Sequence, residues 1–295
     1  MIAACRRVLR PATLDALFAL LEASEPPPLL LAGGTDLIVK AKERLVPEAA
    51  WVDLTALRRA HPELSEIREA AGEVRIGALA TFAAMERSDL LARAAPALFE
   101  AARVIGSPQI RSRGTLGGNL GNASPAGDAI PALYTLQARV VIGSSAGRRE
   151  VPVERLFTGP GRTDLGPCEA ILSVRFARRE GARGAFLRLG QRAAQAISKV
   201  SVALTAVVDG GKPPALHDVR VALGAVAPTV IRATATEAVL EGRALSKAVL
   251  DAARAACEAE SRPITDLRST ADYRREQAGT LLVRAVRRVA GIEPD

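Results

Sequence analysis

Apolar residues recur at the spacing of an amphipathic helix in several parts of the chain. In the first of these, Leu14, Phe18 and Leu21 fall on one face. Thr13 stands before them and can cap the helix that they predict over 13–22. Similar spacing predicts the other long or well-marked helices, which we expect over 37–42, 96–104, 246–260 and 270–290.

Short apolar runs and alternating patterns predict the strands. Val219, Val221 and Leu223 alternate with Arg220 and Ala222, which is typical of a strand with one buried face. Because strands and helices mix without strict βαβ alternation, the predicted fold class is α+β. Further strands are expected at 29–31, 51–54, 74–76, 138–142 and 170–174.

Two segments carry more specific local signals. Thr234 and Glu237 match a capping box, which predicts a short helix that stops at Gly242. Residues 106–128 are rich in Gly, Ser, Asn and Pro, and we expect a long loop there. Such a loop is uncommon in a compact domain unless something orders it.

The length and composition of the chain limit the number of domains it can form. With 295 residues of which 48% are hydrophobic, the chain can bury the cores of two or three domains. We place the boundaries at 1–56, 57–177 and 178–295. No apolar run reaches the ~18 residues that a membrane span needs, and no signal peptide is visible, so we expect a cytoplasmic protein.

Charge and cysteine usage narrow the functional classes. The net charge is +8, but the arginines are scattered and aromatic residues make up 3%, which disfavours nucleic-acid binding. Cys5, Cys168 and Cys257 are far apart, and no C-x-x-C pair occurs. Neither an iron–sulfur cluster, a zinc site nor a disulfide framework is therefore indicated. Redox chemistry would have to come from an organic cofactor or from another subunit.

Two glycine-rich segments, Leu31–Asp36 and Thr115–Asn119, lie about eighty residues apart. Glycine lets backbone N–H groups approach a ligand closely, and successive N–H groups can hold phosphate oxygens. Two such segments suit a long ligand with a central diphosphate, such as a flavin dinucleotide. The first could also be an ordinary strand–helix turn capped by Thr35 or Asp36. Neither a G-x-x-x-x-G-K-[ST] nor a G-x-G-x-x-G motif is present.

Short polar residues surround the second segment. Ser124 and Asp128 follow it closely and could bind a diphosphate or sugar hydroxyls. A third glycine segment, 157–163, either flanks a site or is merely a turn. Asp36, Asp128 and Arg111 could form a catalytic group, but a binding role or a solvated ion pair fits them better.

In these segments the chain resembles the FAD-binding (medium) subunit of the molybdenum hydroxylases, the xanthine dehydrogenase family. The similarity extends over nearly the whole chain, and the ordered set of motifs is specific although single members are not. The segments that carry it are Leu30–Leu37, Arg75–Ala78, Gly106–Arg111, Thr115–Asn119, Ala123–Asp128, Phe157–Gly161, Gly224–Thr229, Asp266–Arg268 and Tyr273–Arg274.

The resemblance implies a two-lobed FAD-binding domain, with a small N-terminal α/β unit and a larger α/β unit, followed by a C-terminal α+β domain. It also implies the roles of residues. Residues 31–38 would wrap the FAD diphosphate, and residues 115–119 would lie on its other side. Asp128 would meet the sugar portion, and Ile105 and Leu172 would give apolar contacts. The implied residues are Leu31, Ala32, Gly33, Gly34, Thr35, Asp36, Leu37 and Ile38; Thr115, Leu116, Gly117, Gly118 and Asn119; Ser124 and Asp128; and Ile105 and Leu172.

The chain departs from the family pattern at two places. Arg188 stands where the family often has a lysine that contacts the cofactor, which keeps the charge but changes its geometry. The segment 191–196 has no acidic residue, whereas NAD-using relatives often carry acids there. NAD therefore cannot be assumed as the acceptor. No inserted cysteine-rich loop is present, so FAD alone is expected in this chain.

The function implied is that of a flavoprotein subunit. Electrons would come from [2Fe–2S] clusters in a small subunit, after oxidation of substrate at the molybdenum cofactor of a molybdopterin-binding large subunit. They would pass through FAD to an acceptor such as NAD, with no catalytic acid, base or metal in this chain. Two alternatives remain: a self-sufficient flavin-dependent oxidoreductase with its own substrate site, and a cofactor-free scaffold.

Overall fold

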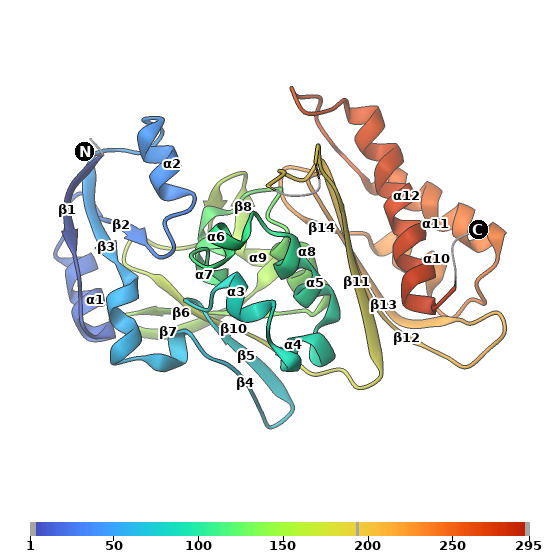
Figure 1. The fold of residues 1–295 in the computed structure, drawn as a ribbon, viewed down its shortest axis with the longest axis horizontal. Coiled ribbons are helices and arrows are strands. Elements are labelled where there is room, and N and C mark those ends of the chain that lie inside the picture. Colours follow the sequence, from blue (N-terminus) through green and yellow to red (C-terminus); the bar gives the residue numbers. More distant parts are fainter. Residues whose placement is uncertain (1–3, 193–194, 293–295) are drawn as a thin grey trace.

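The described part of the chain contains three main sheets, which lie side by side along its long axis, and a separate two-stranded hairpin. The structure is a computed structural model and describes residues 4–192 and 195–292. Figure 1 shows the N-terminal sheet at one end, a central unit of sheet and helices, and a C-terminal sheet covered by long helices at the other end. The mixture of a parallel sheet, antiparallel sheets and separate helices confirms the α+β class.

The N-terminal sheet has three parallel strands in the order β1-β3-β2. Thr13 caps α1 as predicted, because its hydroxyl accepts the N–H of Ala16 at 3.2 Å. Strand β1 was not anticipated, since its sequence CRRVL exposes most of its side chains and has no alternating pattern. The elements of this unit are β1 Cys5–Leu9, α1 Leu14–Glu22, β2 Leu29–Leu31, α2 Leu37–Lys42, β3 Ala49–Asp53, and the 3-10 helices η1 Leu54–Arg59 and η2 Pro62–Leu64.

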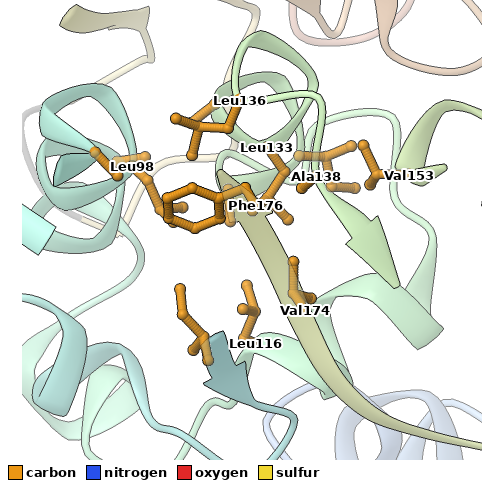
Figure 2. Close-up of a cluster of buried hydrophobic side chains, with 14 of the residues drawn as sticks. Leu98, Leu116, Leu133, Leu136, Ala138, Val153, Val174 and Phe176 are labelled. Atoms are coloured by element: carbon orange, nitrogen blue, oxygen red, sulfur yellow. The ribbon is translucent and has the colours of Figure 1, made fainter. Parts of the chain in front are cut away.

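The central unit is built on a five-stranded antiparallel sheet in the order β4-β5-β10-β6-β7. Its helices cover one face of the sheet and bury a large apolar core between the two layers, in which Leu98, Leu133 and Phe176 meet (Figure 2). The strands are β4 Ile67–Ala70, β5 Glu73–Gly77, β6 Arg139–Ser144, β7 Gly147–Pro152 and β10 Ala170–Ala177, with a separate hairpin of β8 Phe157–Gly159 and β9 Arg162–Thr163. The helices are α3 Phe82–Met85, α4 Asp89–Ala94, α5 Pro96–Val104, α6 Pro108–Arg111, α7 Leu116–Asn122, α8 Ala129–Thr135 and α9 Val153–Leu156.

The C-terminal unit is a four-stranded antiparallel sheet between two sets of helices. Three helices pack on one face around Leu204, Leu282 and Cys257. The other face, through Ala203 and Ala222, closes the core of the central unit. The elements are β11 Ala182–Leu189, β12 Val200–Val208, β13 Leu216–Gly224, β14 Ile231–Arg232, α10 Thr234–Leu240, α11 Lys247–Glu260 and α12 Ala271–Ala290.

Two local predictions were wrong. The segment 106–128 is not one long loop, because Ser107 and Thr115 cap the short helices α6 and α7. Helix α7 is stabilised by Leu116 and Leu120, which are fully buried on its inner face and outweigh the low helix propensity of its glycines. The capping box at α10 also fails, because the Glu237 carboxylate accepts the N–H of Val221 on β13 and not that of Thr234.

Candidate functional site

The two glycine-rich segments lie against each other, although one belongs to the N-terminal unit and the other to the central unit. A Cβ on Gly33 would overlap the carbonyl oxygen of Arg113, just before the second segment. A Cβ on Gly118 would lie 3.8 Å from that of Ala32. The absence of a side chain at Gly33 therefore lets the two backbones approach each other, whereas a Cβ on Gly118 would meet Ala32 at an ordinary van der Waals distance.

The first segment presents a run of free backbone donors. The turn between β2 and α2 includes Gly34 at φ +76°, a conformation that favours glycine. The first helical hydrogen bond runs from the N–H of Ile38 to Gly34. Within residues 4–192 and 195–292, the N–H groups of 33–36 have no backbone or side-chain acceptor. Such consecutive donors suit phosphate oxygens.

The donors of the second segment are used inside the protein. The N–H of Leu116 donates to Ala80 at 3.0 Å and that of Gly117 to Ala78 at 2.8 Å. The N–H of Gly118 donates to the hydroxyl of Thr115 at 3.1 Å. These bonds fix α7 on the segment after β5, so the second segment forms a wall with few free backbone donors.

Asn119 is the polar side chain that this wall leaves unpaired. Its Oδ1 atom is buried and has no hydrogen-bond partner among the described residues. A buried amide oxygen without a partner is unfavourable unless a ligand or water supplies a donor. The arrangement therefore fits a bound polar group beside Asn119.

A side-chain bridge joins the two segments at one end. The Nδ2 atom of Asn122 donates to Asp36 at 3.0 Å, and the Nζ atom of Lys40 donates to Asn122 Oδ1 at 2.6 Å. Thr35 also donates its hydroxyl to Asp36, at 3.4 Å. Lys40 and Asn122 were not identified from the sequence, since nothing in either local pattern indicates a partner about eighty residues away.

Asp128 is held in a buried cluster with residues of the C-terminal unit. Its carboxylate accepts the Nη1 of Arg188 at 2.8 Å and the hydroxyl of Ser198 at 2.6 Å. Burial raises the pKa of the Asp128 carboxyl, and the bonds from Ser198 and Arg188 oppose the rise. Arg188 Nη1 also donates to the carbonyl of Ala196, while its Nη2 is buried without a partner among the described residues. Asp128 thus positions a guanidinium that keeps a free donor.

The other predicted site residues lie around this framework. Leu31, Leu37 and Ile38 are half-buried against the small core under α2, whereas the side chain of Leu116 is fully buried in the central core. Ser124 accepts the N–H of Ala126 at 3.3 Å in a local turn.

Ile105 and Leu172 occupy different surroundings. Ile105 is half-buried at the end of α5, and its carbonyl accepts the Nη1 of Arg111 at 3.3 Å. Leu172 is buried beneath α1 and lines a cavity of about 380 Å³ with Phe18 and Arg148. Leu172 also belongs to the apolar cluster against which Ala32 of the first glycine segment packs.

The three groups considered for catalysis do not come together. Arg111 forms an ion pair with Glu86 at 2.8 Å, Asp128 pairs with Arg188, and Asp36 is bridged by Asn122. The site therefore offers donors, a cation and close backbone approach, but no acid–base pair built from these groups.

The third glycine segment flanks the site. It forms the β8–β9 hairpin, and the N–H of Gly161 donates to the carbonyl of Ala123 at 2.9 Å, at the end of α7. Sequence alone left open whether this segment was a neighbour of the site or an isolated turn, and the structure supports the first.

Comparisons with known proteins show the family to which the chain is similar. Residues 4–177 match the family described as the FAD binding domain in molybdopterin dehydrogenase. Residues 185–289 match the CO dehydrogenase flavoprotein C-terminal domain.

Individual relatives are similar over most of their length. The chain is 33% identical to the carbon monoxide dehydrogenase medium chain of Hydrogenophaga pseudoflava, covering 87% of each. It is 31% identical to a putative xanthine dehydrogenase FAD-binding subunit of Escherichia coli, covering 90% of this chain and 89% of that one.

A solved structure shares the fold. It is a chain of carbon monoxide dehydrogenase from Hydrogenophaga pseudoflava, with a TM-score of 0.91 and 32% identity over 99% of both chains. The chain therefore belongs to the family of FAD-binding subunits of the molybdenum hydroxylases, and it is an oxidoreductase subunit whose cofactor is FAD.

Proposed function

We propose that this chain holds FAD between its two glycine-rich segments and relays electrons from a partner's [2Fe–2S] clusters to an acceptor. The observation that carries the proposal is the row of N–H groups at 33–36 that have no acceptor among the described residues, in a segment that packs beside the start of α7. FAD supplies the ability to take up and release electrons, and the protein binds and orients it.

The first segment would bind the diphosphate. Among the described residues its four consecutive N–H groups have no internal acceptor, and Leu31 and Ile38 on either side of the turn are half-buried against a small core. The second segment would close the opposite side, where Asn119 offers its unpaired Oδ1 to a hydroxyl of the cofactor. The bridge from Asn122 to Asp36 would fix the separation of the two walls.

Arg188 would supply the positive charge of the site. Asp128 and Ala196 fix one nitrogen of its guanidinium, which leaves Nη2 for a polar atom of the cofactor. A planar guanidinium held in this way points its donors in fixed directions, unlike the ammonium group of a lysine. We assign Asp128 to positioning this cation and propose that Ser124 and Ile105 contact the cofactor nearby.

The partners we propose are a molybdopterin-binding large subunit and a [2Fe–2S] small subunit. The relatives support this, because several are named as medium chains or FAD subunits of larger dehydrogenases. NAD or another small acceptor would take the electrons. The residues 193 and 194 of the acid-free segment 191–196 lie outside the described residues.

The remaining proposals concern organisation and compartment. We propose functional units at 1–56, 57–177 and 178–295, each centred on one of the three main sheets. Among the described residues, no helix combines the length and apolarity needed to cross a bilayer. We propose the cytoplasm as the compartment.

A native purification followed by spectroscopy tests this function. We expect the affinity-purified protein to carry flavin and two further polypeptides, and the isolated chain to oxidise no purine or other substrate of the complex. Substrate turnover by the isolated, flavin-loaded chain would instead establish the self-sufficient oxidoreductase. Absence of flavin from the native complex would contradict the proposal.

A further inference from the structure

A group of apolar side chains is exposed beside the N-terminal end of α12. Leu267 is fully exposed at 105%, Ile264 at 68%, Ile197 at 58% and Tyr273 at 41%. We call these four residues the 267 surface. Ile264 and Leu267 come from the segment that leads into α12, which forms the upper edge of the C-terminal unit in Figure 1. Tyr273 lies in the first turn of α12, and Ile197 lies in the segment before β12.

The turn that carries Leu267 is held in place by many bonds. Asp266 accepts the N–H groups of Arg268 and Ser269 and an ion-pair bond from Arg274. Arg274 is 3% exposed and donates its other terminal nitrogen to the carbonyl of Ala225 at 3.2 Å. Leu267 is therefore exposed by a built turn, and an ordered apolar side chain in water is typical of an anchor for a partner's pocket.

The 267 surface adjoins the candidate FAD site. Ile197 is exposed and Lys199 is half-buried, and the intervening Ser198 is buried and donates to Asp128 at 2.6 Å. Lys199 lies over the ring of Tyr273, with Nζ 5.8 Å from the ring centroid. The segment 197–199 therefore contacts the buried cluster around Arg188 through Ser198, and it contributes Ile197 to the 267 surface.

The charges around the surface are mainly positive. Arg274 neutralises Asp266, and Arg275 pairs with Asp272 at 2.7 Å. Among the described residues, Arg262 donates to the backbone carbonyls of Ala259 and Ser261, and Arg268 is 3.9 Å from the already paired Asp266. With Lys199, these arginines give the apolar group a basic rim, which complements an acidic protein surface.

We propose that the 267 surface docks the partner subunit that contains the [2Fe–2S] clusters, through an apolar pocket with an acidic rim. This inference rests on the proposed function, in which electrons enter FAD from that subunit. Electron transfer falls off steeply with distance, so the donor must bind next to the cofactor. The 267 surface is an apolar face that shares its supporting segment with the candidate FAD site.

The test is co-purification of the complete complex with tagged variants of this chain. Leu267→Asp places a charge at the centre of the surface without disturbing a buried contact. Leu45→Asp is the matched control, because Leu45 is another exposed leucine, at 68%, but follows α2 on the N-terminal unit. Arg268→Glu reverses one charge of the rim. Bound flavin and each partner subunit are quantified for every variant.

We expect Leu267→Asp to lower the recovered [2Fe–2S] subunit at least tenfold while flavin stays at the wild-type level, and Leu45→Asp to change neither. Arg268→Glu should weaken association most at low salt. Wild-type recovery of the [2Fe–2S] subunit with Leu267→Asp, or selective loss of the large subunit, would overturn the docking proposal. Loss of flavin from the wild-type complex would contradict the proposed function instead, which keeps the two failures distinct.

Discussion

The carboxylate of Asp128 lies 2.8 Å from the guanidinium of Arg188, and this buried pair connects the central unit to strand β11 of the C-terminal sheet. Removing one member would leave the other charge buried. We expect Arg188→Ala to destabilise the protein by about 3–5 kcal/mol in urea unfolding at pH 8. Asp128→Asn combined with Arg188→Ala should recover part of this loss.

The loss of stability caused by Arg188→Ala should depend on pH. Burial raises the pKa of Asp128 already, and loss of Arg188 removes an interaction that opposes the rise. A raised carboxyl pKa means that the folded state takes up a proton more readily than the unfolded one, so lowering the pH relieves the penalty. The destabilisation by Arg188→Ala should thus be smaller at pH 5 than at pH 8. An equal loss of stability at pH 5 and at pH 8 would contradict the presence of a charged Asp128 carboxylate in the pair with Arg188.

Glycines of helix α7 provide a matched comparison. A Cβ on Gly117 would lie 2.7 Å from that of Ala78, whereas a Cβ on Gly121 would have nothing within 4 Å. We expect Gly117→Ala to cost about 1–3 kcal/mol through overpacking. Gly121→Ala should be neutral or stabilise by up to about 1 kcal/mol, because alanine favours helix. Thermal unfolding of both variants checks the pair, and similar melting temperatures would show that α7 does not pack on Ala78.

Lowering the pH should remove the stabilisation of the folded state that Glu169 provides. Two hydrogen bonds from Arg149, at 2.6 and 2.7 Å, hold the pKa of this carboxyl below its usual value of 4.5. A lowered folded-state pKa stabilises the protein above 4.5, and the stabilisation is lost as pH falls through the folded value. Because Arg149 is partly exposed, we expect at most about 1 kcal/mol. The stability difference between wild type and Glu169→Gln should therefore be present at pH 7 and vanish near pH 3.

The three cysteines should differ in reactivity. Cys257 is fully buried between α11 and α12, and burial together with Glu260 and Glu258 raises the pKa of its thiol to about 12. Thiolate is the reactive form, so Cys257 should resist alkylation in the folded protein. Cys5 and Cys168 are half-buried and should be modified first. Mass spectrometry after brief iodoacetamide treatment resolves the order, and early labelling of Cys257 would refute the packing described.

Sequence pattern was a good guide where local signals agreed. Helix α5 begins at Pro96 and ends at Val104 as predicted, because a proline at the first position and an inward apolar face act together. Helix α7 was missed, because its glycines concealed the helical spacing of Leu116 and Leu120. Tertiary burial outweighed propensity there.

The candidate site was predictable in its parts but not in its assembly. The glycine segments were visible, yet the sequence did not show that one keeps its N–H groups free while the other uses them on Ala78 and Ala80. Nor did it show the bond between Asp128 and Ser198, which depends on how the C-terminal sheet packs on the central unit. Long-range pairs of this kind follow from the complete fold.

The central claim is that the turn at 33–36 binds the diphosphate of FAD, and titration of the deflavinated chain with FAD tests it most directly. Gly34 has φ +76°, where a β-branched residue is strained, and Gly121 in α7 has open space around it. We predict that wild type and Gly121→Ala bind one FAD per chain, and that Gly34→Val binds at least tenfold more weakly. Unchanged FAD affinity in a folded Gly34→Val protein would contradict the claim.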